Sequence, residues 1–166
     1  MHAFGLWCRG ILFTILVPGM VGGYIPWRLA EQDHGVVWPA GWALIAAGAA
    51  LYLWCIGRFL LAGGTPNIFF ARHLSFLIGT EPPGLVSRGP YRYSRNPMYV
   101  GVLLAVFGQA VLFRSWRIAV YGACCWAFFH LIVVLVEEPH LKRLHGARYE
   151  EFLRSRPRWF GLEAGN

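Results

Sequence analysis

The sequence predicts an all-α integral membrane protein with about four transmembrane helices, a C-terminal helical hairpin and a cytoplasmic amphipathic tail helix. Three observations support this fold class. The 166 residues are 57% hydrophobic and only 14% charged, whereas a soluble domain carries about a quarter charged residues. The apolar residues form long runs, and the basic residues stand between the runs. Aromatic residues, which settle at membrane interfaces, make up 16% of the chain.

The first apolar run, Ile11–Ile25, predicts a span over residues 9–26. Pro18 lies inside this run, and the missing N–H of proline predicts a kink there. A secretory signal peptide is the alternative, but no small-residue cleavage pattern follows the run. The run is therefore expected to be the first span of a single membrane domain over residues 1–166.

Three further apolar runs predict spans over residues 37–62, 97–113 and 117–136. A helix needs about 20 residues to cross the hydrocarbon core of a bilayer. The second and fourth runs are long enough, and the first and third are short. The polar connection Arg114–Arg117 separates the last two runs, so these runs are expected to form an antiparallel helical hairpin.

Composition also disfavours two classes of site. The net charge of +7 is compatible with nucleic-acid binding, but the basic residues follow a membrane topology rather than a soluble face. No nucleic-acid partner is therefore expected. All four cysteines fall inside apolar runs and form no C-x-x-C spacing. They are expected to be small buried hydrophobic residues, with neither a disulfide framework nor a metal site.

The distribution of basic residues predicts the orientation. Four arginines precede the third span and six basic residues follow the fourth, and with four spans these segments lie on the same side. The opposite side carries Arg28, Arg114 and Arg117, with Glu31 and Asp33 nearby. The positive-inside rule therefore places both termini in the cytoplasm.

Two segments outside the spans are expected at the membrane surface. Asn67–Ile78 is apolar but too short to span, which predicts an interfacial helix that ends at Glu81–Gly84. His140–Arg156 carries apolar residues among basic ones at roughly helical spacing. This pattern predicts an amphipathic helix that lies on the membrane or folds back over the spans.

The densest group of polar and aromatic residues is the stretch 88–101. Pro97 stands where the third span should begin, a position at which the missing N–H costs nothing. The N–H groups that follow it favour anions, and Arg92 and Arg95 add positive charge. Three tyrosines offer flat faces to a cation or an adenine ring: Tyr91, Tyr93 and Tyr99. The alternative is a juxtamembrane anchor, with Arg at anionic lipid headgroups and Tyr at the interface.

Glu137 and Glu138 form a second group at the inner end of the fourth span. Carboxylates next to hydrocarbon are costly and indicate function by default. His130 is seven residues earlier, or two α-helical turns, and is expected on the face of Glu137. The alternatives are an ion pair of the glutamates with Arg95 or Arg148, and a His130 that only hydrogen-bonds a neighbouring helix.

Four elements occur in order around the hairpin: the stretch 89–101, the run Glu137–Leu141, the segment 146–152, and Arg156-Pro-Arg-Trp159. In these elements, the chain resembles the isoprenylcysteine carboxyl methyltransferase and phospholipid methyltransferase superfamily. The resemblance implies a small membrane methyltransferase that uses S-adenosylmethionine. Its cofactor pocket would lie at the cytoplasmic ends of the last two spans and be closed by the tail.

Carried over by position, the resemblance assigns a role to each matching residue. The residues that would hold the cofactor at the turn are Tyr91, Arg95, Asn96, Pro97, Met98, Tyr99 and Gly101. Glu137 and Glu138 would bind its polar groups, and Tyr149 and Arg156 would help to close the pocket. His130 matches a histidine in the fourth span of such proteins. The prenylcysteine enzymes carry His at the position of Asn96, which disfavours prenylcysteine as the acceptor.

The chemistry of S-adenosylmethionine agrees with these residue types. Its carboxylate suits Arg95, its ammonium and ribose hydroxyls suit a glutamate, and its sulfonium suits an aromatic face. Direct displacement of the methyl group needs alignment and exclusion of water. An amine or phenol acceptor would also need a base, and Glu138 or His130 is the candidate. Arg95 is the third residue expected to take part in catalysis.

The expected partners are the lipid bilayer and a lipophilic or small-molecule methyl acceptor, which is a carboxylate, an amine or a thiol. Two other interpretations compete with this one. A sterol-reductase-like membrane oxidoreductase would have similar last spans, but such enzymes are much larger. A non-catalytic membrane protein that retains the fold is the second. The sequence leaves the acceptor and the oligomeric state open.

Overall fold

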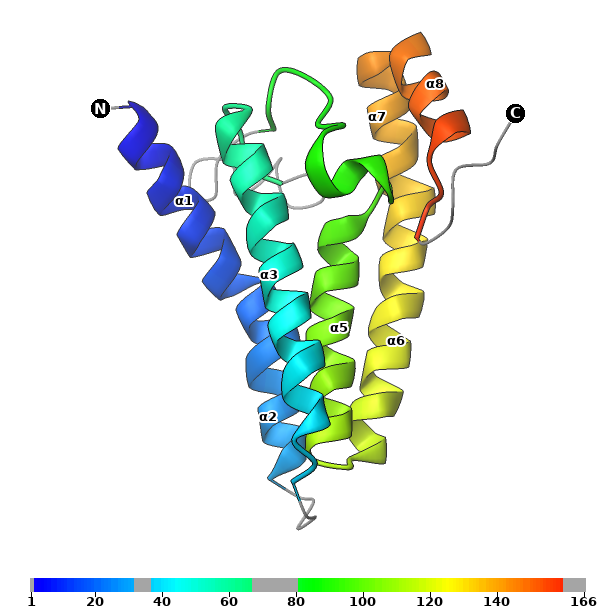
Figure 1. Cartoon of the computed structure of the whole chain (residues 1–166). Coiled ribbons are helices and arrows are strands. Elements are labelled where there is room, and N and C mark those ends of the chain that lie inside the picture. Colours follow the sequence, from blue (N-terminus) through cyan, green and yellow to red (C-terminus); the bar gives the residue numbers. More distant parts are fainter. Residues whose placement is uncertain (1, 32–36, 67–80, 160–166) are drawn as a thin grey trace.

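The computed structural model describes residues 2–31, 37–66 and 81–159, and every regular element within them is a helix (Figure 1). The expected interfacial helix over 67–78 lies outside the described residues. Three helical stretches are long and apolar enough to cross a membrane: Trp7–Ala30, Ala40–Leu61 and Trp116–His145. A shorter apolar helix, Pro97–Leu112, lies between the last two in the sequence. The predicted all-α membrane fold is confirmed.

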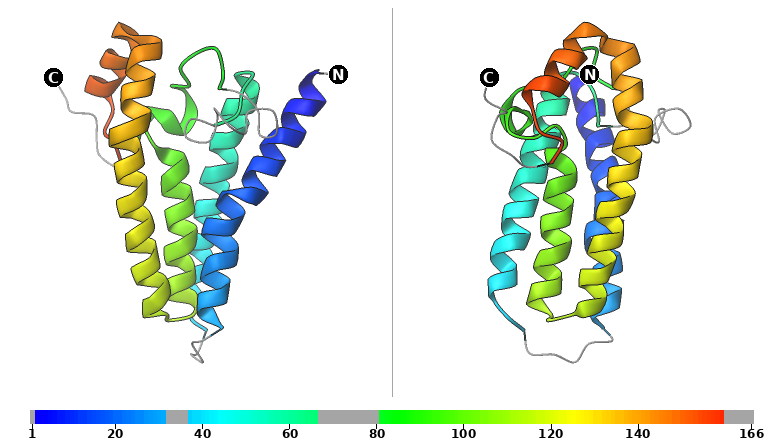
Figure 2. Two further views of the ribbon diagram at one scale, coloured as in Figure 1. Left: turned by 180° about the vertical axis from the view of Figure 1, so that it is seen from behind. Right: turned by 90° about the vertical axis from the view of Figure 1, so that its right-hand side faces the viewer.

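The first stretch contains α1 (His2–Leu16), the π-helical segment η1 (Met20–Tyr24) and α2 (Ile25–Ala30). The regular α-helical pattern is interrupted at Val17, immediately before Pro18, as the missing proline N–H requires. On the N-terminal side of Val17, α1 diverges from the other helices as it approaches the end of the molecule that carries the C-terminal helices (Figures 1 and 2).

The helices α3 (Ala40–Leu61) and α5 (Pro97–Leu112) form the tightest pair in the bundle. A Cβ atom on Gly48 would lie 2.5 Å from the carbonyl oxygen of Gly101, closer than any side chain tolerates. Small residues let helix backbones approach in this way where lipid removes the usual hydrophobic drive. A second close pair is formed by Gly41, seven residues before Gly48 in α3, and Gly108, seven residues after Gly101 in α5.

The predicted hairpin is formed by α5 and α6 (Trp116–Ile132). Arg114 adopts a positive φ of 50° in the connection. Ser115 caps α6, because its Oγ accepts a hydrogen bond of 3.3 Å from the N–H of Ile118. The helix then continues without a break through the π-helical segment η3 (Val133–Glu137) into α7.

The tail contains two helices, where the sequence predicted one over residues 140–156. The helix α7 (Glu138–His145) ends at Gly146, whose φ of 52° is readily adopted by glycine. The chain reverses there into α8 (Ala147–Ser155). Tyr149 and Phe152 of α8 are buried against residues at the ends of α3 and α5. The tail therefore folds back over the spans.

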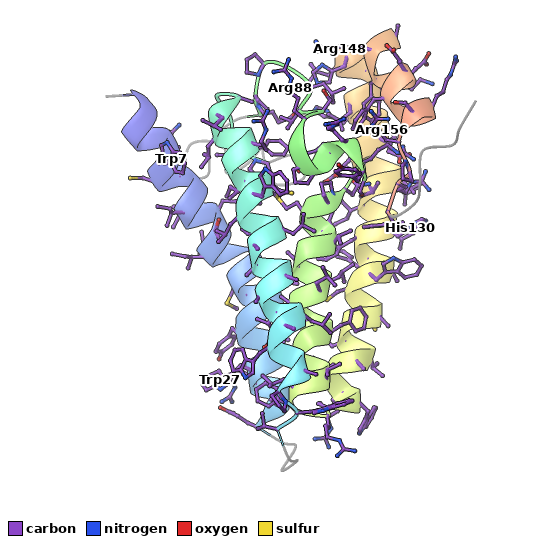
Figure 3. The ribbon with its side chains drawn as sticks, in the orientation of Figure 1. Trp7, Trp27, Arg88, His130, Arg148 and Arg156 are labelled. Carbon is purple, nitrogen blue, oxygen red and sulfur yellow. The ribbon has the colours of Figure 1, made fainter. Side chains whose placement is uncertain are left out.

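The outer surface of the spans is apolar, as a lipid-facing surface should be. Large hydrophobic side chains are exposed along α1, α3 and α6. Cys55 and Cys125 are buried as predicted, whereas Cys8 and Cys124 are exposed, because they lie on outward faces of their helices. Figure 3 shows Arg88, Arg148 and Arg156 at the end of the bundle that carries the tail, and Trp27 at the opposite end. We call the end with the tail the basic end.

Candidate cofactor site

A cavity of about 140 Å³ lies between the spans at the basic end. Its walls come from α1, α3, α5 and α6, from the segment 81–86 and from the tail, and most of its lining is apolar. The topology therefore brings the two halves of the sequence motif to one place. The predicted cofactor residues that line the cavity are Tyr91, Arg95, Asn96, Met98, Tyr99, Glu137 and Tyr149.

Glu137 is the deepest acidic group of this cavity, with 8% of its surface exposed. Its carboxylate accepts a short hydrogen bond from the hydroxyl of Tyr99 on α5. The ring of Tyr99 is packed against Phe129 of α6, with ring centroids 4.7 Å apart. The carboxylate is thus held in one position by the two helices of the hairpin.

Arg95 lies just before the N-terminus of α5 and lines the same cavity. Its Nη1 donates to Glu138 Oε1 over 2.9 Å. Its Nε is buried and has no hydrogen-bond partner among the residues that the structure describes. A buried donor without an acceptor is costly. An acceptor atom brought to this nitrogen by a ligand would satisfy it.

Glu138, next to Glu137 in sequence, does not line the cavity. Its carboxylate accepts the bond from Arg95 and two bonds from Arg158, 2.8 Å from Nε and 3.0 Å from Nη2. The pair raises the pKa of Arg158, chiefly through these hydrogen bonds to Glu138. The ion pair with Arg95, which the sequence offered as the alternative role for the glutamates, is present for Glu138. The carboxylate is occupied by two arginines, and the structure gives it no place at a ligand.

The segment 157–159, which we call the tail clamp, binds the turn before α5. The N–H of Arg95 donates to the carbonyl of Pro157 over 2.9 Å. The carbonyl of Arg158 accepts from Asn96 Nδ2 at 3.0 Å and from Ser94 Oγ at 3.3 Å. These bonds, with the Arg158–Glu138 pair, fix the tail beside the cavity.

His130 contacts the tail clamp and does not line the cavity. Trp159 Nε1 donates to His130 Nδ1 over 3.2 Å, and the two rings are stacked with centroids 6.2 Å apart. The expectation that His130 shares a face with Glu137 is wrong because it assumed regular α-helix. The π-helical segment η3 widens the turns between these residues, so Glu137 lines the cavity while His130 contacts Trp159. Figure 3 shows His130 near the tail.

Three other residues that were predicted to hold the cofactor or close its pocket make contacts within the fold instead. Pro97 begins α5, and Gly101 packs against Gly48 of α3. Arg156 Nη1 donates to the carbonyl of Ser155 over 2.7 Å. None of the three lines the cavity.

The cavity also contains residues that sequence reasoning did not select. Glu81 was interpreted only as part of a break after the segment 67–78, yet its side chain lines the cavity. An acidic residue between an apolar segment and a Pro-Pro pair was the available signal. Leu141 and Phe152 also line the cavity, and they belong to the motif elements although the sequence assigned them no role. Other lining residues carried no signal beyond their apolar or basic character: Phe13, Tyr52, Phe129 and His145.

The buried tyrosines outside the spans remain neutral at physiological pH. Burial raises the pKa of Tyr149 to about 12. Burial likewise raises the pKa of Tyr91 well above its usual value of 10.0. Both phenols therefore donate hydrogen bonds or offer ring faces to a ligand, and neither serves as a base.

Comparison with known proteins assigns the family of this fold. Residues 37–148, more than half of the chain, match the phospholipid methyltransferase family model. The chain belongs to the phospholipid methyltransferase family. The resemblance found in the sequence is thereby confirmed. The matched region includes Glu81, Arg95, Tyr99 and Glu137 of the cavity.

One curated relative is phosphatidylethanolamine N-methyltransferase B from Dictyostelium discoideum. The two sequences are 34% identical over 67 residues. This segment covers 38% of the present chain and 32% of the relative, so the similarity spans about a third of that protein. No solved structure gives a significant match to the chain.

Proposed function

We propose that this protein transfers the methyl group of S-adenosylmethionine to the amine headgroup of a phospholipid. One observation carries the proposal. The cavity at the basic end brings together Glu137 and Arg95, whose Nε is unpartnered among the described residues, and both lie within the region matched to the phospholipid methyltransferase family. An acidic group and a free cationic donor suit the ammonium and the carboxylate of the cofactor's methionine part.

The other lining residues fit the rest of this cofactor. The unpaired N–H groups at the start of α5 add positive potential near Arg95. The rings of Tyr91, Tyr99 and Tyr149 offer faces that suit a sulfonium and an adenine. The residues that would hold the cofactor are therefore Arg95, Tyr91, Tyr99, Glu137 and Tyr149. When bound, the cofactor supplies an electrophilic methyl group.

The protein's contribution is alignment and exclusion of water. Methyl displacement needs the attacking atom, the methyl carbon and the sulfur in line, which favours a rigid and dry cavity over strong acid catalysis. The hydrogen bond from Tyr99 orients Glu137, and the buried Phe152 of α8 covers the cavity from the tail side. The tail clamp holds this cover in place.

A phospholipid acceptor agrees with the membrane side of the cavity. Phe13, Val17 and Val21 of the first helical stretch form an apolar wall there, which suits acyl chains. The curated relative is named for methylation of the nitrogen of phosphatidylethanolamine, and this supports an amine. We further propose that the basic end faces the cytoplasm, because most of the Arg and Lys residues outside the spans lie there.

Titration calorimetry of the detergent-purified protein tests the cofactor. S-Adenosylhomocysteine and S-adenosylmethionine are expected to bind with micromolar affinity, and NADPH is expected not to bind. Transfer of labelled methyl from S-adenosylmethionine to phosphatidylethanolamine in mixed micelles tests the acceptor, with a fatty carboxylate and an alkyl thiol as comparison acceptors. A folded protein that gives no heat with either adenosyl compound would sink the proposal. Binding with transfer only to the carboxylate or the thiol would overturn the amine assignment.

A further inference from the structure

The proposed amine acceptor requires a proton acceptor, and neither of the two residues expected in that role lines the cavity. Glu138 is bound by Arg95 and Arg158 and lies outside the cavity. His130 accepts a hydrogen bond from Trp159 and also lies outside the cavity lining. A protonated amine has no lone pair, so it cannot attack a methyl carbon until its proton has a destination.

Glu81 is the second carboxylate that lines the cavity. Its two oxygens lie 3.0 Å and 3.1 Å from Nε2 of His140 on α7. The side chain of Glu81 is 19% exposed and that of His140 is 38% exposed. His140 does not line the cavity. The pair therefore connects the cavity wall to the outer surface of the molecule at the basic end.

The backbone at Glu81 is held firmly. A Cβ atom on Gly64 would lie 2.6 Å from the carbonyl carbon of Glu81 and 2.1 Å from the nitrogen of Pro82. The chain after α3 is thus packed directly against this peptide, and only glycine leaves the space. Pro82 is also buried. A carboxylate on so fixed a backbone is positioned in advance, as proton transfer requires.

The charges around the pair favour a cationic ligand. Glu81 and Glu137 line the same cavity and interact electrostatically. The other charged or titratable groups of α7 are Glu138, Lys142, Arg143 and His145. Glu138 is paired with two arginines, and Lys142 is paired with Glu150. The ionisable groups in the cavity lining are therefore two carboxylates, the imidazole of His145 and the guanidinium of Arg95, whose Nη1 is paired with Glu138. An ammonium headgroup is attracted to this arrangement.

We propose that Glu81 binds the ammonium of the acceptor and takes its proton, and that His140 passes this proton to water. The proposal rests on the proposed function. The amine nitrogen, once deprotonated, forms the new bond to the methyl carbon while the carbon–sulfur bond breaks and its electron pair stays on sulfur. One proton leaves through Glu81 for each methyl group transferred, and S-adenosylhomocysteine is the other product.

The first test compares wild-type protein with Glu81→Gln and His140→Gln, which keep hydrogen-bonding side chains at both positions. Glu81→Gln is expected to lower kcat for phosphatidylethanolamine about 100-fold near pH 7. The deficit should shrink as the pH rises toward about 9.5, where more of the amine is already deprotonated. His140→Gln should show a smaller loss with the same pH trend. Affinity for S-adenosylhomocysteine should stay within about twofold, since neither residue is assigned to the cofactor.

Binding of short-chain lipids gives a readout that does not depend on turnover. Glu81→Gln is expected to weaken phosphatidylethanolamine binding about tenfold. It should leave phosphatidylglycerol, whose headgroup has no ammonium, unchanged. Glu150→Gln is the matched control, because Glu150 pairs with Lys142 on the surface of the tail, away from the cavity.

The results separate this proposal from the proposed function. Normal kcat, normal pH profile and equal lipid binding in Glu81→Gln would overturn the role of Glu81 while leaving methyl transfer intact. If Glu81→Gln does not fold, His140→Gln carries the test, and an unchanged pH–rate profile in that variant overturns the relay. Failure of S-adenosylhomocysteine to bind the wild-type protein contradicts the proposed function instead, and the comparison of lipid binding still tests the ammonium contact.

Discussion

The seam between α3 and α5 and the basic end of the molecule are built in opposite ways. Along the seam, glycines bring two backbones into direct contact, and a Cβ on Gly41 would lie 2.4 Å from the carbonyl oxygen of Gly108. At the basic end α1 diverges, and a cavity remains among side chains from four helices, the segment 81–86 and the tail. The close contacts of the seam glycines are made by backbone and by side chains such as Ile45, Leu104 and Leu112, whereas the cavity is surrounded by ion pairs and hydrogen bonds.

The difference separates stability from chemistry. In lipid, close van der Waals packing replaces the hydrophobic effect as the force between helices, so the seam can hold the bundle without polar groups. The basic end then tolerates a cavity and buried charges. Substitutions at the seam should therefore affect folding, and substitutions around the cavity should affect ligands. The predictions below test this division.

The largest effect is expected from Gly48→Leu at the seam. The new side chain meets the backbone of α5, which cannot move aside without separating the helices. The loss should exceed about 3 kcal/mol of unfolding free energy. Circular dichroism during heating in detergent measures it. Gly57→Ala on the same helix is the control, since a Cβ there meets nothing within 4 Å, and it should keep or raise the Tm. Equal Tm values for the two variants would contradict the seam's role.

The next effect distinguishes the two adjacent carboxylates. Glu137→Gln is expected to weaken S-adenosylhomocysteine binding about tenfold or more with little change in Tm, because Glu137 faces the cavity. Glu138→Gln should do the reverse and cost about 1–3 kcal/mol of stability, because two arginines lose their partner. Calorimetric titration and thermal unfolding of both variants provide the comparison. Identical behaviour of the two would refute the assignment.

A smaller effect is expected from the tail clamp. Arg158→Gln removes the ion pair with Glu138 but keeps the main-chain bonds at residue 158. The tail should then open more often, which should raise its cleavage rate by chymotrypsin, whose aromatic sites the substitution leaves unchanged, about three- to tenfold and lower cofactor affinity to a similar degree. The matched control is Glu150→Gln, a surface pair from which no change is expected. An unchanged cleavage rate in Arg158→Gln would contradict the proposal that the tail clamp holds the tail beside the cavity.

The smallest effect concerns pH. The pKa of Tyr149 is raised to about 12 in the folded protein by burial, above its value near 10 in an unfolded chain. Its contribution to stability is therefore complete below pH 10 and is lost as the pH rises toward 12, because only the unfolded chain ionises in that window. Tyr149→Phe should make the alkaline loss of unfolding free energy less steep. Denaturant titrations at about pH 9 and about pH 11 measure the difference. An equally steep loss would contradict it.

Much of the fold could be predicted because the bilayer imposes simple rules. Apolar runs and basic connections indicate the spans, and Pro97 marks the start of α5. The gathering of Arg95, Tyr99 and Glu137 in one cavity also agrees with the motif read from the sequence. These residues share the short connection or the ends of one hairpin, so local geometry brings them together.

The remaining errors have a common physical cause, which is that contacts with distant segments cannot be read from spacing. The π-helical turn before Glu137 rotates one carboxylate to the cavity and the next to the tail, and α-helical counting misses this. Glu81 reaches the cavity from a connection in which Pro82 is packed against Gly64, a contact between segments that sequence spacing does not show. The ring of His130 is oriented by a hydrogen bond from Trp159, which is 29 residues away in the sequence.

The tail clamp has a consequence for biosynthesis. Ribosomes make the chain from its N-terminus, so residues 157–159 emerge after all the spans have been made. Until they reach the turn before α5, Arg95 lacks the carbonyl of Pro157, and Glu138 lacks Arg158. Insertion into the membrane and assembly of the ligand site are therefore separate events in time. A nascent chain halted after α6 has its bundle but does not yet have a complete site.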